Sequence, residues 1–292
     1  MNKINSIAVI GATGMLGKPV TEELAKAGFT IRTIARSVDK ARQILPSEIE
    51  VVEGNVKEIA SLQKGFEGMD SVYISLSSYP NERNAKFKTE FNGINNIRKA
   101  AEAKGIKRIG YLSSLVQNYE GIDWWVFKIK RLACDILNES AIPTTIFYPS
   151  SFYENLSQLQ LKGNRIMLAG NQKTQSWWIG AHDYGKQVAR SFQVLDDENR
   201  EYSIQGPKPY NFDEAAEVFI NHYQPKDLKT LKAPLGIFKY LGWFSNEMDF
   251  QYHILYAINH YDEQFQSEQT WHELGKPKTT LAAFAESFGK SS

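Results

Sequence analysis

Residues 6–17 read Ser-Ile-Ala-Val-Ile-Gly-Ala-Thr-Gly-Met-Leu-Gly, and this stretch decides the fold. Its first apolar run is typical of a buried strand, and the helical pattern of Lys18–Ala27 follows directly. Gly11 predicts a sharp turn, Gly14 a close backbone approach to a pyrophosphate, and Gly17 tight packing of helix against strand. The first N–H groups of a helix lack intrahelical partners and favour an anion. The stretch therefore predicts a dinucleotide site, with a plain tight turn as the alternative.

The end of the second expected strand, Thr30–Ala35, indicates which dinucleotide binds. An acidic residue at this point would bond the ribose 2′-hydroxyl of NAD(H). This chain instead has Arg36 followed by Ser37, with Lys40 and Arg42 close behind. A guanidinium can bind a 2′-phosphate through two charge-assisted hydrogen bonds, whereas a carboxylate would repel it. We therefore expect NADP(H) to be favoured over NAD(H); the alternative is that Arg36 serves surface solubility.

Length and composition place the chain among ordinary globular proteins. Its 292 residues can bury a substantial core, and 42% of them are hydrophobic. A net charge of +1 offers no broad field for nucleic acid or an acidic membrane, and no apolar run is long enough to span a membrane. The single cysteine, Cys134, excludes an intramolecular disulfide and suits a reducing compartment. The N-terminus leaves no room for a signal peptide, so we expect a cytoplasmic protein without nucleic-acid or membrane partners.

Expected strands and helices alternate along the first half of the chain. Further strands are expected at 49–52, 71–76, 108–112 and 144–148, and helices at 61–66, 87–104 and 125–137. This alternation predicts an α/β, Rossmann-type fold with a doubly wound parallel sheet, whose strand ends line the ligand crevice. We expect a dinucleotide-binding domain at 1–150 and a smaller, mostly helical substrate lobe at 151–292. Residues 182–206, with a seventh strand at 201–205, are expected to return to the sheet.

Several segments resemble one family, the NmrA-like and isoflavone-reductase-like atypical short-chain dehydrogenases/reductases. The Gly-x-x-Gly-x-x-Gly spacing of residues 11–17 is typical of that superfamily. Gly54-Asn55-Val56 resembles its segment before the fourth strand, with Asn55 where an adenine-contacting Asp usually stands. Residues 103–114 are similar to its approach to the fifth strand, 140–156 to its sixth strand and the following loop, and 274–284 to its final helix. The resemblance implies an NAD(P)-binding fold and a small-molecule substrate.

The glycine turn, the strand ends and this resemblance together predict the cofactor contacts. They are Gly11, Thr13, Gly14, Met15, Leu16, Gly17, Arg36, Asn55, Val56, Leu76, Ser77, Ser113, Lys130, Tyr148, Pro149 and Ser151.

The resemblance also places the catalytic question at Lys130. This position corresponds to the superfamily's lysine, which follows a proton-transferring tyrosine by four positions, and Val126 stands in the tyrosine's place. Leu115 likewise replaces the small polar residue that usually follows Ser113-Ser114. The ordinary catalytic set is therefore absent.

Lys130 nevertheless lies on the apolar face of its expected helix, with Ala133, Cys134 and Leu137. A lysine on such a face is costly unless it is paired, which indicates a function. We predict a contact to the cofactor and a role in proton transfer. The alternatives are a lysine that snorkels to solvent or one that only clamps the ribose hydroxyls.

The second half of the sequence is rich in aromatic residues. Residues 231–265 carry them at helical spacing, which predicts a small lobe closing over the crevice. A wide apolar crevice suits a flat or aromatic substrate such as a quinone. Asp183 is expected to cap a helix over 184–195. His253 and His260 lack further ligands at metal-binding spacing, so no metal is expected.

Three functions compete on this evidence. The first is an NAD(P)H-dependent reductase of a small carbonyl, enone or quinone, with a proton from Lys130 or solvent. The second is a non-catalytic redox sensor that binds NADP(H) and signals to a protein partner. The third, a sugar-nucleotide epimerase, needs the missing tyrosine. Retention of Lys130 and an aromatic pocket favour the reductase.

Overall fold

The computed structural model describes residues 3–194, 197–224 and 227–291, and its framework is a parallel sheet. In this part of the chain seven strands pair in the order β10-β6-β5-β4-β1-β2-β3, all parallel. They are β1 (Ser6–Ile10), β2 (Thr30–Ala35), β3 (Glu50–Glu53), β4 (Ser71–Ile74), β5 (Arg108–Leu112), β6 (Thr144–Pro149) and β10 (Arg200–Ile204). The strand order reverses between β1 and β4, which is where ligands bind in such sheets. The predicted Rossmann-type fold is confirmed.

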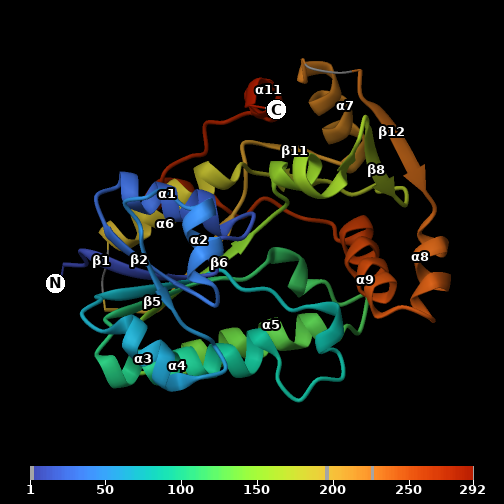
Figure 1. Ribbon diagram of the computed structural model, residues 1–292. Coiled ribbons are helices and arrows are strands. Elements are labelled where there is room, and N and C mark those ends of the chain that lie inside the picture. Colours follow the sequence, from blue (N-terminus) through green and yellow to red (C-terminus); the bar gives the residue numbers. More distant parts are fainter. Residues whose placement is uncertain (1–2, 195–196, 225–226, 292) are drawn as a thin grey trace.

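Helices cover both faces of this sheet (Figure 1). One face carries α1 (Gly17–Lys26), α2 (Val38–Ile44), α6 (Ala181–Gln193) and α10 (Glu268–Leu274), and the other carries α3 (Ile59–Phe66), α4 (Ile94–Lys104) and α5 (Trp125–Asn138). Side chains of β1 alternate between the two cores: Ile7 and Val9 pack toward α1, whereas Ala8 and Ile10 pack toward α3 and α4. The helix α6 ends at Gln193, before the end expected from the sequence, and the last residue of that expectation, Leu195, lies outside the described residues.

The helix expected over residues 87–104 begins later in the structure. Its α-helical part starts at Ile94 and follows a single π turn, Thr89–Gly93. A π turn contains an extra residue, so it rotates the preceding side chains relative to the helix face. As a result Glu90 is fully buried, whereas Phe91 is only partly buried.

The second half forms a smaller lobe with short strands that the sequence patterns did not predict. Its elements are β7 (Leu161–Lys162), β8 (Arg165–Ala169), β9 (Ser176–Trp178), β11 (Lys208–Tyr210), β12 (Lys229–Ala233), α7 (Phe212–His222), α8 (Leu235–Gly242), α9 (Asn246–His260) and α11 (Leu281–Ser291), with a π turn at Asn155–Gln160. Two 3₁₀ turns, Pro80–Glu82 and Leu115–Asn118, lie in the first half of the chain, after β4 and β5. The helical pattern expected from residue 231 is wrong at its start, because β12 pairs there with β8. No helix in the described part of the chain combines the length and the apolar composition needed to cross a membrane.

Asp183 is not the N-cap that the sequence pattern predicts. The helix α6 begins two residues earlier, at Ala181, whose N–H donates to the buried carboxylate of Glu154 at 2.9 Å. The Asp183 carboxylate instead accepts the backbone N–H groups of Lys278 and Thr279 at 2.8 and 2.6 Å. Asp183 therefore fastens the segment before α11 to α6.

Replacing Asp183 with alanine should lower the free energy of unfolding by about 1.5–3 kcal/mol, because buried backbone donors would lose a charged acceptor. Burial alone would raise the pKa of Asp183, but Lys186 and the bonds from Thr279 outweigh burial and lower it. This stabilisation is therefore present at neutral pH and is lost as the pH falls through the depressed pKa. Urea unfolding at pH 7 and at acidic pH measures both effects. The exposed carboxylate of Asp213, paired with Lys232, is the control, and Asp213→Ala should cost less than about 1 kcal/mol; equal losses would contradict the assignment.

Candidate functional site

The glycine turn after β1 has the geometry that the sequence predicted. Gly11 adopts a φ of +86°, and a Cβ there would overlap the carbonyl oxygen of Ser75. A Cβ on Gly17 would in turn overlap the carbonyl oxygen of Gly11. Gly14 differs, because the nearest atom to its Cβ position is the Gly11 oxygen at 3.4 Å. Packing within the chain therefore requires glycine at positions 11 and 17. At Gly14 it does not, and the absence of a side chain there leaves open space above the turn.

The predicted adenosine contacts follow β2 and β3 at the same edge of the sheet. Arg36 is exposed, and its guanidinium makes no hydrogen bond or ion pair with any described residue. The Asn55 side-chain oxygen accepts the N–H of Lys57 at 3.1 Å, and the carbonyl of Val56 accepts the side-chain amide of Asn96 at 2.9 Å. The structure therefore brings these predicted residues to one edge, outside the cavities described next.

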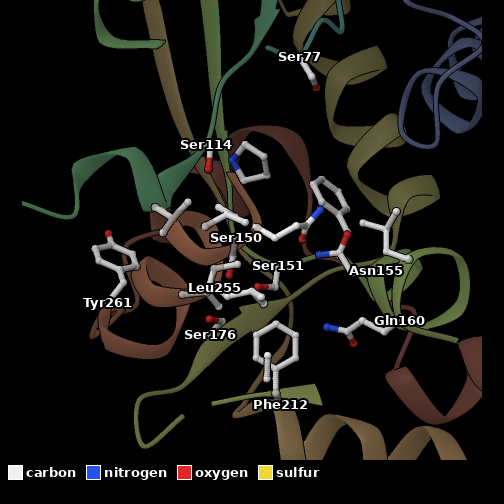
Figure 2. A pocket seen from close by; sticks show the side chains of 18 of the residues that line it. Ser77, Ser114, Ser150, Ser151, Asn155, Gln160, Ser176, Phe212, Leu255 and Tyr261 are labelled. Atoms are coloured by element: carbon white, nitrogen blue, oxygen red, sulfur yellow. The ribbon is translucent and has the colours of Figure 1, made fainter. Parts of the chain in front are cut away.

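A cavity of about 690 Å³, which we call the main cavity, lies between this sheet edge and the lobe. Seven of the predicted cofactor residues line it, namely Leu16, Leu76, Ser77, Ser113, Lys130, Pro149 and Ser151. Figure 2 shows Ser77 at one end and Phe212 at the other, with Ser150 between them. The lobe contributes mostly apolar side chains, among them Phe238, Met248, Leu255 and Ile258. A largely apolar cavity with a few convergent polar groups is typical of a small-molecule site.

The other predicted contacts lie elsewhere. Thr13, Gly14 and Met15 line a second cavity of about 670 Å³, which reaches toward α11. The side chain of Tyr148 turns toward Cys134 and Glu201, and burial raises the pKa of its hydroxyl. Tyr148 does not line the main cavity. Its predicted cofactor contact stays a prediction.

Lys130 is paired with a buried carboxylate. Its Nζ donates to Oε1 of Glu90 at 2.6 Å; the Lys130 side chain is 15% exposed and the Glu90 side chain is fully buried. Oε1 also accepts the Tyr111 hydroxyl at 3.0 Å, and Oε2 accepts the N–H and hydroxyl of Ser78 at 2.7 and 2.8 Å. Burial and the Glu90 carboxylate raise the pKa of Tyr111, which keeps its hydroxyl a donor. An ammonium has three donors, so this pairing leaves donors of Lys130 for a ligand.

Val126, at the position of the missing tyrosine, is covered by a helix of the lobe. Val126 is buried in an apolar cluster with Trp124, Phe127 and Ala257, the last of which belongs to α9. Among the described residues, Lys130 hydrogen-bonds to no tyrosine. Tyr261 lines the main cavity, but burial raises its pKa, the opposite of the activation that a neighbouring lysine would provide.

Sequence reasoning missed two buried carboxylates in or beside the cavity. Glu90 stands four residues before the buried Ile94, and a charged residue on that apolar stripe was the available signal. Glu263 follows α9, which ends at His260, before the end of the helical spacing expected up to residue 265; no sequence pattern therefore indicated that Glu263 lines the cavity.

No metal centre is apparent in the part of the chain that the structure describes, since no group of three or more His, Cys, Asp or Glu side chains is placed to hold an ion. His253 and His260 donate through Nδ1 to the carbonyls of Asp249 and Tyr256 in their own helix, at 2.7 and 2.8 Å.

The doubly wound parallel sheet, with a glycine turn at its switch point, defines a Rossmann-type nucleotide-binding fold. A model of the NmrA-like family matches residues 3–285 of the 292. The chain belongs to this family.

Known proteins share its fold at low sequence identity. The chain is 24% identical over 255 residues to the photosystem II assembly factor Ycf39 of Trieres chinensis, covering 84% of this chain and 79% of that protein. The solved triphenylmethane reductase of Citrobacter sp., complexed with NADP(H), superposes with a TM-score of 0.75 at 20% identity, covering 97% of this chain and 99% of that one. An NADPH-dependent quinone oxidoreductase from Escherichia coli superposes with a TM-score of 0.71 at 21% identity, with the same coverage.

Replacing Gly14 with leucine should abolish NADP(H) binding, because the side chain would occupy the open space above the turn. Thermal unfolding should change little, since the Cβ position meets nothing closer than 3.4 Å. Isothermal titration calorimetry measures the affinity. Gly236→Leu in α8 is the matched control, because a Cβ there meets nothing within 4 Å and the residue lies outside the glycine turn. Unchanged affinity in the Gly14 variant would place the pyrophosphate elsewhere.

Proposed function

We propose that this chain is an NADPH-dependent reductase of a small carbonyl, enone or quinone. The observation that carries the proposal is the Lys130 ammonium, held by the fully buried Glu90 in the wall of the main cavity. A lysine that served only solubility would not need a carboxylate buried to orient it. NADPH oxidation measured against a panel of quinones and enones tests the proposal.

The residues present fit the cofactor. Gly14 leaves the space that a pyrophosphate needs, and the N–H groups of Leu16 and Gly17 at the start of α1 donate to no backbone carbonyl of the described residues. Arg36 offers a guanidinium unengaged by any described residue, which supports NADP(H) over NAD(H). When bound, NADPH supplies a hydride. Leu76, Ser77 and Pro149 then belong to the wall beside its nicotinamide end.

The substrate class follows from the remaining lining. Apolar side chains of α8 and α9 face the serines of the strand ends across the cavity, which suits a flat molecule with few polar atoms. Lys130 would donate to a ribose hydroxyl and to the substrate oxygen that gains charge. The names of two structural neighbours, a triphenylmethane reductase and a quinone oxidoreductase, agree with this class.

The alternative is a redox sensor that binds NADP(H) without turnover and reports to a protein partner. Burial of Val126 beneath α9 favours it, because the usual proton donor is replaced by an apolar contact. A wild-type protein that binds NADPH and oxidises it with none of the panel would support the sensor.

The cofactor preference can be tested at Arg36. Arg36→Asp should weaken NADPH binding by about 1.5–3 kcal/mol, the scale of a charged hydrogen bond, and weaken NADH binding less. Calorimetry with both cofactors measures the difference. Arg42→Asp makes the same change in net charge nearby and separates a direct contact from a general field. Equal loss for NADPH and NADH would place Arg36 away from the 2′-phosphate.

The role of Lys130 is tested with a variant in which its partner Glu90 is changed as well. Lys130→Met alone would leave Glu90 buried without its cation, which typically costs about 3–5 kcal/mol. The double variant Lys130→Met, Glu90→Gln removes both charges and should reduce turnover about 10²–10³-fold, the effect of losing one donor to a developing oxyanion. NADPH affinity should fall by only about 1 kcal/mol. Steady-state kinetics compare it with Glu90→Gln alone; equal turnover in the two variants would remove Lys130 from the chemistry.

A further inference from the structure

A second buried carboxyl group, Glu263, faces the main cavity from the segment after α9. It is 7% exposed. Its Oε1 accepts the Gln205 side-chain amide at 2.7 Å and the N–H of Trp177 at 3.2 Å. Its Oε2 accepts the hydroxyl of Ser150 at 2.7 Å. Donors from three separate segments therefore fix this group in one position.

Glu263 differs from Glu90 in having no cation. Within the described residues no lysine, arginine or histidine nitrogen lies within 4.0 Å of its carboxyl group. Its neighbours Ser150, Trp177 and Gln205 are neutral, and the titratable group that faces it is the Tyr261 phenol. Burial raises the pKa of Glu263, against the opposing effect of its hydrogen bonds. Lys130, which is paired with Glu90, and Glu263, whose pKa is raised by burial, thus line the same cavity. A titratable group with a shifted pKa inside a cavity is typical of acid–base sites.

Ser150 connects this carboxyl to the cavity. It stands between the predicted cofactor residues Pro149 and Ser151, and Figure 2 shows its position among the lining side chains. Its N–H donates to the carbonyl of Ile204 at 2.9 Å, which holds the backbone against β10. A hydroxyl can accept from a protonated carboxyl while it donates to a ligand. In the structure this hydroxyl donates to Glu263; protonation of Glu263 reverses the bond and turns the Ser150 proton toward the cavity.

We propose that Glu263 is the acid of this reductase and that its proton reaches the substrate through the Ser150 hydroxyl. The proposal rests on the proposed function. The substrate gains a hydride from NADPH and the hydroxyl proton of Ser150, Ser150 takes the proton of Glu263, and solvent reprotonates the carboxylate. The relay supplies what a tyrosine at Val126 would supply, from the lobe side of the cavity.

Steady-state oxidation of NADPH with menadione and with benzylideneacetone tests the relay. E263Q and Ser150→Ala should each lower kcat by about 10²-fold or more, the usual contribution of a general acid, with KM changed little. In the wild type kcat should fall as the pH rises through the raised pKa of the acid. E263Q should lose this alkaline decline, because glutamine has no proton to lose, and a merely structural role would not remove it.

The matched control is E273Q. Like Glu263, Glu273 accepts a side-chain hydroxyl, that of Tyr202 at 2.6 Å. It lies outside the main cavity, however, and its pKa is lowered, first by that bond. E273Q should leave kcat and its pH profile unchanged. An independent readout is the infrared band of protonated carboxyl groups, recorded at a pH just above the ordinary titration range of glutamate. E263Q should remove part of that band, and E273Q should not.

Each outcome is decisive. If E263Q and Ser150→Ala turn over as fast as the wild type, or if E263Q leaves the infrared band intact, the relay is wrong. The proposed reductase function is then unaffected. Absence of NADPH oxidation with both probes overturns the proposed function and the relay together. Should E263Q fail to fold, Ser150→Ala keeps the test, because it leaves the carboxyl and its two other hydrogen bonds in place.

Discussion

The close approach of Gly11 to Ser75 and Gly17 is the constraint on which the rest of the structure depends. No side chain fits at either glycine, so the end of β1 lies directly against the end of β4 and α1 starts immediately above. This contact fixes the switch point of the sheet. The loops that follow β4, β5 and β6 then meet at one edge, and residues from all three line one cavity.

The sequence predicts the sheet well because its central strands β1, β4, β5 and β6 are buried on both faces. β2 and β5 have the expected bounds, since continuous or alternating apolar runs there end at turn residues or charged residues. The lobe strands were not predictable. β12 is exposed along most of its length and includes two lysines, so its strand conformation comes from pairing with β8 and not from its own pattern.

The candidate site divides in the same way. The buried side of α5 follows from its periodicity, which places Lys130 correctly beside Ala133 and Cys134. The partner of Lys130 does not follow, because the π turn before α4 changes which side chains face inward, and nothing in the local sequence marks that turn. Glu263 was equally hidden, since its hydrogen-bond donors come from three distant segments that only the folded chain brings together.

The helix α8 is far more exposed than the walls around it. None of its eight residues, all of them described, is buried, and Trp243 and Phe244 beyond its end are 74% and 77% exposed. Yet Phe238 of this helix lines the main cavity. Changes in α8 therefore carry little penalty for the fold while they alter the shape that a ligand meets. Divergence of substrate preference among related chains can proceed through this one element, with the glycine turn and the two carboxyl groups left intact.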